Sequence, residues 1–415
     1  MIKEIIKEFI PGFLLDFYHF SLAGFGAFLY RFPSSKIKII GVTGTNGKST
    51  VVSLATKILE EAGCKVASIS SIKFKLGEKE WKNDLKMTMP GRLKLQKFLR
   101  QAVNTGCQYV VLEVTSEGIK QHRHCFIDFD TAVFTNLTPE HIESHGSFEK
   151  YKEAKGKLFQ ATKNIHIINL DDKNAEYFLK FPARKKYTYG LEKGDINTKN
   201  TQFKLNLFGE FNIYNSLAAI CIGLSQGVDL ETSQKALEKI KAIPGRMEKV
   251  VDKPFTVIVD YAHTPDSLVK VYQTIRNSKF KIQNSKLICV LGSTGGGRDK
   301  WKRPEMGKIA DQYCDEIILT NEDPYDENPE KILDEIFSGF SKSNLKNQIS
   351  KIYRILDRKE AIKKALTLAK SGDIVIITGK GCEPWMCVAD GRKIPWDDRQ
   401  VVREQLEELK IKSQK

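Results

Sequence analysis

The segment Gly41–Val52, which reads GVTGTNGKSTVV, constrains the fold of this chain more than any other. An apolar, β-branched run at residues 37–42 leads into it, and an amphipathic pattern begins at Lys48. The sequence therefore predicts a strand, a glycine-rich turn and a helix in direct succession. In such a turn the backbone N–H groups and the positive end of the helix dipole bind phosphate together.

The side chains that close the turn fit the same chemistry. Lys48 supplies a positive charge for terminal phosphates, and the Ser49 hydroxyl is a suitable ligand for Mg²⁺. Five residues separate Gly41 from Gly47, so the loop is a variant of the pattern G-x4-G-K-[ST]. A turn with an ordinary surface lysine is the alternative, but the flanking strand and helix favour a nucleoside triphosphate site.

Composition limits the partners that we expect. A chain of 415 residues exceeds one ordinary core and predicts roughly two or three domains. Its net charge of +15 suits polyanionic small substrates or an acidic membrane surface. The basic residues are spread along the chain without an arginine-rich tail, which argues against nucleic acid. Eight scattered cysteines without a C-x-x-C pair indicate reduced thiols.

The first 35 residues differ from the rest of the chain. Residues 13–32 are rich in aromatic side chains and include only Asp16, His19 and Arg31 as ionisable groups besides tyrosine. We expect a short helical segment, a pair of helices packed on the body of the protein. The alternative is an interfacial anchor that makes peripheral contact with a membrane beside a basic surface. A signal peptide is less consistent, because a nucleotide-binding strand follows at once.

Residues 36–244 alternate between apolar strands and amphipathic helices, which predicts a mostly parallel α/β sheet with helices on both faces. The expected strands are Ile37–Val42, Val66–Ile69, Tyr109–Glu113, Thr131–Thr135 and Ile165–Asn169. The expected helices are Lys48–Ala62, Arg92–Asn104, Phe148–Gln160 and Asn212–Gln226.

A break at Pro244-Gly245 separates a second alternating series, residues 245–415. Its expected strands are Thr256–Asp260, Lys286–Gly292, Glu316–Thr320, Lys351–Ile355 and Asp373–Thr378. Helical periodicity covers Thr264–Arg276, Pro304–Tyr313 and Arg358–Lys370. This half therefore predicts a separate Rossmann-like α/β domain.

Polar residues follow several predicted strands, where open α/β sheets bind their ligands. Glu113 ends one strand, and a polar run that includes His141 follows another. Lys155 lies on the helix that comes next. A carboxylate and an imidazole that face the phosphate turn are reasonable ligands for Mg²⁺ bridging ATP and a second substrate, although each alone could be a capping or surface residue.

Seven motifs, in this order, resemble the signature set of the Mur ligases. They are GVTGTNGKST (residues 41–50), EVTSEGIKQHR (113–123), FTNLTPEHIESHGSFEKYKEAKGKLF (134–159), GEFNIYNSLAA (209–219), PGRME (244–248), DYAHTPDSL (260–268) and GKGCE (379–383). The chain is most similar to the branch of UDP-N-acetylmuramoyl-tripeptide synthetases, from about Lys36 onwards. On this resemblance residues 36–244 form the central ATP-binding domain and 245–415 the C-terminal domain.

The resemblance implies an ATP-dependent amide ligase of peptidoglycan synthesis, and hence a role in cell shape and division. A carboxylate of an anionic cell-wall precursor takes the γ-phosphoryl group to form an acyl phosphate, which the amine of an amino acid attacks. ATP and Mg²⁺ are the implied cofactors. A cytoplasmic, monomeric enzyme is expected.

The resemblance also assigns roles to individual residues. The implied catalytic residues are Lys48, Glu113, His141, Lys155 and His263, with Lys155 reacting with CO₂ to form a carbamate. The implied metal ligands are Ser49, Glu113, His141 and carbamylated Lys155. The implied ATP-binding residues are Gly44, Thr45, Asn46, Gly47, Lys48, Ser49, Thr50, Asn212, Asn215, Arg246 and Asp260. The implied substrate-binding residues are Thr88, Ser116, Gln121, Arg123, Arg298, Glu322, Asp323, Gly379 and Glu383.

Three departures from the family pattern bear on substrate choice. Fewer than forty residues precede the phosphate-turn strand, where the family has a uridine-diphosphate-binding domain, so a lipid-linked acceptor becomes an alternative. The motif Asn-Thr-Thr-Pro reads Met87-Thr88-Met89-Pro90. The specificity motif Asp-Asn-Pro-Arg reads Glu322-Asp323-Pro324-Tyr325, and a tyrosine cannot form the charged fork that binds a distal carboxylate.

Because Glu322, Asp323 and Glu383 offer negative charge, we expect lysine or ornithine rather than diaminopimelate as the added amino acid. Three alternatives stay open. They are a polyglutamate- or cyanophycin-like ligase, a ligase that amidates a lipid-linked precursor, and a non-catalytic nucleotide-binding relative.

Overall fold

The computed structural model describes residues 11–85, 87–277, 285–340 and 352–413. By the density of contacts the chain divides into two compact units. The first comprises residues 1–137, 147–205 and 212–239, and the second comprises residues 138–146, 206–211 and 240–415. Two short segments that precede residue 240, 138–146 and 206–211, thus group with the second unit, which a linear division of the sequence does not anticipate.

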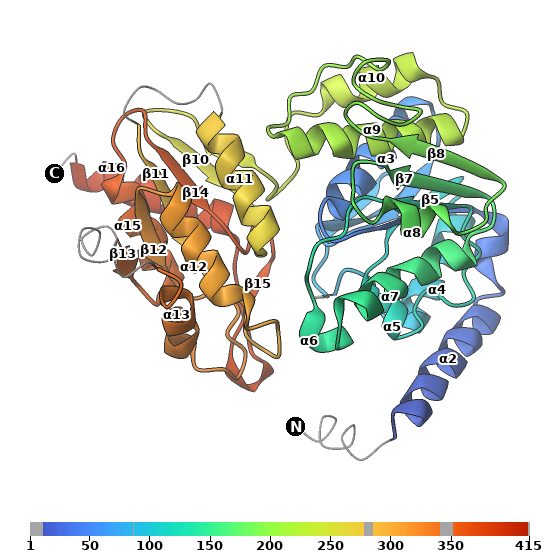
Figure 1. Ribbon diagram of the computed structural model, residues 1–415, viewed down its shortest axis with the longest axis horizontal. Coiled ribbons are helices and arrows are strands. Elements are labelled where there is room, and N and C mark those ends of the chain that lie inside the picture. Colours follow the sequence, from blue (N-terminus) through green and yellow to red (C-terminus); the bar gives the residue numbers. More distant parts are fainter. Residues whose placement is uncertain (1–10, 86, 278–284, 341–351, 414–415) are drawn as a thin grey trace. The chain divides into compact units, whose positions relative to one another are not determined.

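The first unit is built on an eight-stranded sheet with the strand order β4-β3-β2-β5-β1-β6-β7-β8 (Figure 1). Its strands are β1 (Lys38–Thr43), β2 (Val66–Ile69), β3 (Lys73–Leu76), β4 (Lys79–Lys82), β5 (Tyr109–Glu113), β6 (Thr131–Phe134), β7 (Ile165–Asn169) and β8 (Lys185–Tyr189). The neighbours from β2 to β8 run parallel, and β3 and β4 add an antiparallel hairpin at one edge.

Helices cover both faces of this sheet, as the alternating pattern predicted. The described helices of this unit are α2 (Gly12–Leu29), which packs on α4, α3 (Lys48–Glu61), α4 (Arg92–Asn104), α5 (Ser116–Lys120), α7 (Phe148–Ala161), α8 (Ala175–Leu179), α9 (Glu210–Ser225, whose first two residues belong to the second unit) and α10 (Leu230–Lys239). Ile39 belongs to a core cluster with α4, α7 and α8. Its neighbour Ile40 is equally buried but points to the other face, because successive strand residues alternate.

The second unit contains a six-stranded sheet with the order β13-β12-β11-β14-β10-β9. Its strands are β9 (Glu248–Val251), β10 (Thr256–Val259), β11 (Leu287–Leu291), β12 (Glu316–Leu319), β13 (Ile352–Arg354) and β14 (Ile374–Ile377), and β15 (Trp385–Cys387) pairs with β16 (Lys393–Pro395) separately. All pairs in the larger sheet are parallel except β9 with β10. Core clusters lie on both faces, which confirms the predicted Rossmann-like arrangement.

The remaining helices of this unit are α6 (Ile142–His145), α11 (Pro265–Asn277), α12 (Lys302–Tyr313), α13 (Pro329–Phe337), α15 (Arg358–Leu368) and α16 (Asp398–Ser413). Helix α15 begins where the Asp357 side chain accepts the N–H of Glu360. The Arg358 guanidinium forms a two-pronged ion pair with Asp398, at 2.8 Å for each prong, and both side chains are fully buried. This pair joins the first turns of α15 and α16. Lys351, the first residue of one expected strand, lies outside the described residues.

Candidate active site

The glycine-rich turn lies between β1 and α3, as predicted. Gly47 precedes the first residue of α3 in a left-handed conformation, with φ of 84°. A Cβ atom there would lie 2.3 Å from Oδ1 of Asn215, so only glycine allows α9 to approach the turn. Gly44 has φ of 151°, and a Cβ atom there would lie 1.9 Å from Oγ1 of Thr135. Asn215 also donates to Oδ1 of Asn212 at 3.0 Å, so the two predicted asparagines act as one polar pair.

The turn is held from the end of β6. The backbone N–H of Thr45 donates to the carbonyl of Asn136 at 2.8 Å, and the N–H of Asn46 donates to Asn136 Oδ1 at 2.9 Å. The Thr135 hydroxyl donates to the Asn46 carbonyl at 2.7 Å. Sequence reasoning did not assign this bracing role to Thr135 and Asn136. The available signal was their position, since Thr135 is the last residue of a predicted strand and Asn136 follows it directly.

A cation, a hydroxyl and a carboxylate meet beside the turn. The Ser49 hydroxyl donates to Glu113 Oε2 at 2.7 Å, and the N–H of Ser71 donates to the same oxygen at 2.9 Å. Lys48 Nζ lies 4.0 Å from Glu113 Oε1 and donates to the Thr45 carbonyl at 2.7 Å. The ends of α3 and β5 therefore bring together Lys48, Ser49 and Glu113, which the sequence predicted at one sheet edge. The next residue, Thr50, is buried.

These groups fit a magnesium ion. Ser49 Oγ and Glu113 Oε2 are 2.7 Å apart. This distance is close to the edge of an octahedron with Mg–O bonds of about 2.0–2.1 Å, which is roughly 2.9 Å. In the described part of the chain no group of three or more His, Cys, Asp or Glu side chains is arranged to hold a metal. Hydroxyl oxygens and oxygens from a substrate or modified side chain would therefore have to complete the coordination.

Lys155 enters the same cluster from α7. Its side chain is 1% exposed, and its Nζ donates to the Gly44 carbonyl at 2.7 Å. The ammonium also lies 4.5 Å from the ring centroid of Tyr151, whose hydroxyl is 3.1 Å from Thr45 Oγ1. The predicted proximity of Lys155 to the phosphate turn is therefore present in the structure, with Tyr151 as an additional neighbour that the sequence did not suggest.

The predicted substrate-binding residues of the first unit gather around Arg123. Its guanidinium donates to Gln121 Oε1 at 2.8 Å and to the carbonyl of Met89, next to half-buried Thr88. Burial, with a further contribution from the positive charge of Arg92, lowers the pKa of Arg123. Ser116 begins α5 and is buried. An anionic ligand that neutralises Arg123 would therefore be favoured here.

His141 groups with the second unit, in the segment that contains Glu140 and α6. His263 Nε2 lies 3.3 Å from Glu140 Oε1, and His141 Nε2 lies 3.9 Å from Glu140 Oε2. Burial alone would raise the pKa of Glu140, but His141, His263 and Lys302 outweigh it and hold that pKa well below its usual range. The structure thus places His141 and His263 around one buried carboxylate, and the metal-binding role of His141 stays a prediction.

The predicted Asp260 directly follows β10, and the predicted Arg246 lies just before β9, whose first residue, Glu248, pairs with Val259 at the end of β10. The Asp260 carboxylate accepts the N–H groups of Met247 and Ala262 at 2.6 and 2.7 Å, and burial raises its pKa. The Arg246 guanidinium lies 4.2 Å from the ring centroid of Tyr261. In turn, the Tyr261 hydroxyl donates to Glu383 Oε1 at 2.9 Å. An arginine stacked on a tyrosine presents a flat, charged surface.

Predicted acidic residues at the ends of β12 and β14 contact a lysine that the sequence reasoning missed. Lys380 is fully buried, and its Nζ lies 2.8 Å from Asp323 Oδ2 and also pairs with Glu383. Glu322 accepts the Thr294 hydroxyl through Oε1 at 2.6 Å, whereas its buried Oε2 has no hydrogen-bond partner within the described residues. The sequence had suggested that Asp323 and Glu383 offer negative charge to a ligand. In the structure both carboxylates are instead paired with Lys380.

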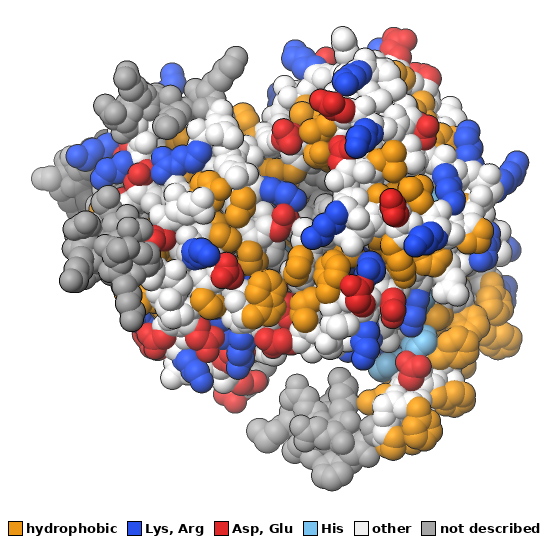
Figure 2. Space-filling view, viewed as in Figure 1, with side chains coloured by type: hydrophobic (Ala, Val, Ile, Leu, Met, Phe, Trp, Pro, Cys, Tyr) orange, Lys and Arg blue, Asp and Glu red, His pale blue; other side chains and the backbone are white. Residues whose placement is uncertain are grey.

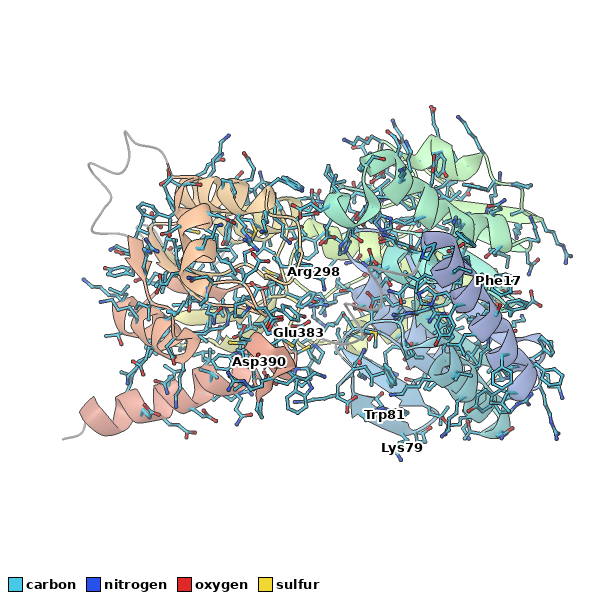
Figure 3. All side chains as sticks on the ribbon, turned by 90° about the horizontal axis from the view of Figure 1, so that it is seen from below. Phe17, Lys79, Trp81, Arg298, Glu383 and Asp390 are labelled. Atoms are coloured by element: carbon cyan, nitrogen blue, oxygen red, sulfur yellow. The ribbon has the colours of Figure 1, made fainter. Side chains whose placement is uncertain are left out.

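Gly379 and Arg298 are the other two predicted substrate-binding residues of the second unit. Gly379 has φ of 105°, and a Cβ atom there would lie 2.2 Å from Glu322 Oε2. Burial would lower the pKa of Arg298, but the neighbouring Tyr261, Tyr325, Glu140 and Glu383 raise it. Figure 3 shows Arg298 and Glu383 close together in this unit.

The first unit has the phosphate turn, cation and carboxylate of a P-loop nucleotide-binding domain, and the second is a separate α/β domain with charged residues at its strand ends.

Models of two protein domains match the chain. The Mur ligase middle domain matches residues 42–223, and the glutamate ligase domain of Mur ligases matches residues 245–381. A UDP-N-acetylmuramoyl-L-alanyl-D-glutamate--2,6-diaminopimelate ligase of Syntrophomonas wolfei is 39% identical over 410 residues, covering 93% of this chain and 81% of the relative. The enzyme of the same name from Aquifex aeolicus is 40% identical over 391 residues, covering 90% and 78%.

Comparison with solved structures also gives ligases that are similar to this chain. The chain is similar to a diaminopimelate ligase of the same name, with a TM-score of 0.59 and 31% identity over 90% of this chain and 79% of the other. The folylpolyglutamate synthase of Mycobacterium tuberculosis shares the fold, with a TM-score of 0.66 and 15% identity over 87% and 92%. This chain belongs to the Mur ligase family, and it is an ATP-dependent amide ligase.

Proposed function

We propose that the chain adds an amino acid to UDP-N-acetylmuramoyl-L-alanyl-D-glutamate or a closely similar cell-wall precursor. The observation that carries this proposal is the cluster of Lys48, Ser49, Glu113 and Lys155 around one phosphate-binding turn. The substrate follows from the names of the relatives, of which two are 39% and 40% identical to this chain. Most of the polypeptide thus corresponds to enzymes of the tripeptide-synthetase branch.

The residues present would act chiefly by positioning and by neutralising charge. The turn N–H groups and Lys48 hold the phosphates of ATP, while Asn212 and Asn215 support the turn from α9. Arg246 and Asp260, which belong to the second unit, are the further nucleotide-binding residues of this proposal. The γ-phosphoryl group passes to the acceptor carboxylate, and the amino acid's nitrogen then displaces phosphate from the acyl phosphate to form the amide.

Mg²⁺, held by Ser49 and Glu113, would neutralise charge on the phosphates when bound. For His141 a metal-binding role is proposed on the family resemblance alone. Lys155 is proposed to carry a carbamate, which supplies oxygen ligands that the unmodified side chain lacks. Its complete burial against the Gly44 carbonyl and the Tyr151 ring limits exchange with water. Bicarbonate labelled with ¹³C should give a carbamate signal in the wild type that Lys155→Arg lacks, and its absence from active enzyme would contradict this assignment.

We propose lysine or ornithine as the added amino acid. Tyr325 provides no positive charge for the distal carboxylate of diaminopimelate. Because Lys380 already pairs with Asp323 and Glu383, the proposal depends on Glu322, whose buried Oε2 could accept a side-chain ammonium. Thr88, Ser116, Gln121 and Arg123 would hold the acceptor, and Arg298 would bind the α-carboxylate of the amino acid. We also propose a monomeric enzyme located in the cytoplasm.

One experiment tests the reaction and the substrates together. The purified protein is supplied with ATP, the UDP-linked dipeptide acceptor and each amino acid in turn, and ADP release and product mass are measured. Lys48→Ala should abolish turnover, whereas Lys57→Ala, an exposed lysine on the same helix that pairs with Glu60, should retain it. Turnover that survives Lys48→Ala would refute the nucleotide site, and a clear preference for diaminopimelate would refute the predicted amino acid.

A further inference from the structure

Helix α2 has an unusual distribution of side-chain sizes. Its buried residues are the small ones, Ala23, Gly26 and Ala27. Nine of the fourteen exposed large hydrophobic side chains in the described residues lie here or just beyond, and they are Phe13, Leu14, Phe17, Tyr18, Phe20, Phe25, Phe28, Leu29 and Phe32. The aromatic residues Phe13, Phe17 and Phe28 are 72%, 69% and 71% exposed. A helix on a water-facing surface normally has the reverse arrangement, with its large apolar side chains inward.

The small residues let α2 lie close against the first unit. A Cβ atom at Gly26 would come within 3.3 Å of Leu93 on α4, and one at Gly24 within 3.1 Å of Phe126. Near the start of the helix, Asp16 pairs with His122 at 2.7 Å. At its end, the Arg100 guanidinium donates to the Tyr30 carbonyl at 2.9 Å. The helix is therefore attached along most of its length and not only at one end.

The exposed surface of α2 is largely apolar, and Figure 2 shows hydrophobic side chains gathered in this region beside a few acidic and histidine side chains. Phe126, itself 40% exposed, extends it, because its ring centroid lies 5.0 Å from that of Phe20. Asp16, the one formally charged residue of α2, is already paired. A cluster of exposed large hydrophobic side chains on a protein surface marks an interaction site.

Charge identifies the partner. Helix α4, which packs beneath α2, carries four basic residues and no acidic one, and of these Lys94 and Lys97 are exposed, Arg100 is half-buried and Arg92 is buried. An apolar helix with large aromatic side chains and basic residues beside it is the combination that binds an anionic lipid surface. A second copy of this chain would instead bring two such basic helices together, at a cost in repulsion.

We infer that α2 seats the first unit on an anionic lipid bilayer, with its aromatic side chains buried among the acyl chains. In the described part of the chain α2 is the one helix long and apolar enough to cross a membrane, at 18 residues or about 27 Å. Because it is attached to the unit from Asp16 to Tyr30, it lies in the plane of the interface rather than across the bilayer. Such an anchor would hold the ligase beside acceptors that are made or used at the membrane.

Vesicle binding tests this inference without any measurement of turnover, so it is independent of the proposed reaction. The full chain is sedimented with vesicles of phosphatidylcholine alone or mixed with phosphatidylglycerol. We expect it to bind the mixed vesicles, and Phe13→Ser/Phe17→Ser/Phe28→Ser to weaken binding at least about 100-fold. The matched control is Trp81→Ser/Trp301→Ser/Ile394→Ser, which removes three exposed hydrophobic side chains elsewhere and should bind as wild type does.

A second measurement reports the depth of the helix. Phe17, labelled on α2 in Figure 3, is replaced by tryptophan in a background with Trp81→Phe, and the new fluorescence is the difference from the Trp81→Phe protein, whose three other tryptophans lie in the second unit. Quenching of the new fluorescence by brominated acyl chains would support insertion, and quenching only by aqueous iodide would overturn it. Wild-type protein that stays in the supernatant, or a lipid-free dimer that dissociates in the triple serine variant, would also overturn the inference, the latter in favour of a second copy.

Discussion

The buried lysine of the second unit allows a quantitative prediction. Lys380 is fully buried between Asp323 and Glu383, whose side chains are 6% and 24% exposed. In Lys380→Met the Glu383 carboxylate can turn toward water, but Asp323 keeps a buried charge with no cation at its former distance of 2.8 Å. Breaking a buried pair in this way costs about 3–5 kcal/mol. For a unit of this size the loss corresponds to a decrease in Tm of roughly 6–20 °C.

Urea unfolding followed by tryptophan fluorescence measures this loss. Three of the four tryptophans lie in the second unit, so a Trp81→Phe background reports on that unit alone. The matched control is Lys359→Met, which removes an exposed pair with Glu408 at 3.6 Å and should cost less than about 1 kcal/mol.

A double variant separates charge from packing. Lys380→Met/Asp323→Asn should recover roughly 1–2 kcal/mol of the loss, because the asparagine leaves no buried charge. If Lys380→Met is as stable as Lys359→Met, or if the asparagine recovers nothing, the claim that an uncompensated carboxylate causes the loss is refuted.

Two further outcomes are expected. Gly44→Ala should weaken ATP binding by about 100-fold in calorimetry, since the new methyl group displaces Thr135 from the turn. The control is Gly63→Ala, where φ is 81° and the space around the glycine is open. It should leave ATP affinity unchanged at a stability cost of about 1 kcal/mol. Burial lowers the pKa of His124 from 6.5 to about 4. As the pH falls below 6.5, His124 is protonated in the unfolded chain but stays neutral in the folded one until about pH 4. The free energy of unfolding is therefore highest above pH 6.5 and decreases by up to about 3 kcal/mol as the pH falls toward 4. His124→Gln should flatten the decrease measured by urea unfolding, and an unchanged pH profile would contradict the assignment.

Hydrophobic patterning predicted the central strands because they are buried on both faces. The strands Val66–Ile69 and Tyr109–Glu113 occur as expected, and β1 begins and ends one residue later than predicted. Helix α4 also agrees at both ends. The edge hairpin β3–β4 was missed, since its exposed lysines dilute the apolar pattern. In the N-terminal segment the composition predicted a pair of short helices, whereas the described residues contain one helix of 18 residues, α2. The packing of its small residues depends on contacts with α4 that no local pattern shows.

The site was predictable where one motif supplies several groups. Lys48 and Ser49 are adjacent in sequence, and strand order brings Glu113 to them. Lys380 was missed because its role depends on Asp323, 57 residues away on a different strand end. Glu140 and His141 are adjacent in sequence, but the approach of His263 to Glu140 is a tertiary contact that spacing along the chain does not show.

The two outermost strands of the eight-stranded sheet have a consequence for crowded solutions. On one side β4 ends the sheet with Lys79 and Lys82, and on the other β8 begins with Lys185 and Lys186, all four exposed. If a second molecule added its own edge strand to this sheet, the lysine ammonium groups of the two edges would lie close together. Their repulsion would oppose the pairing of the two strands. Fibril growth by edge addition is thereby discouraged at both borders, and at β8 the bonds of Thr188 with Asp195 and Ile196 also occupy part of the outer edge.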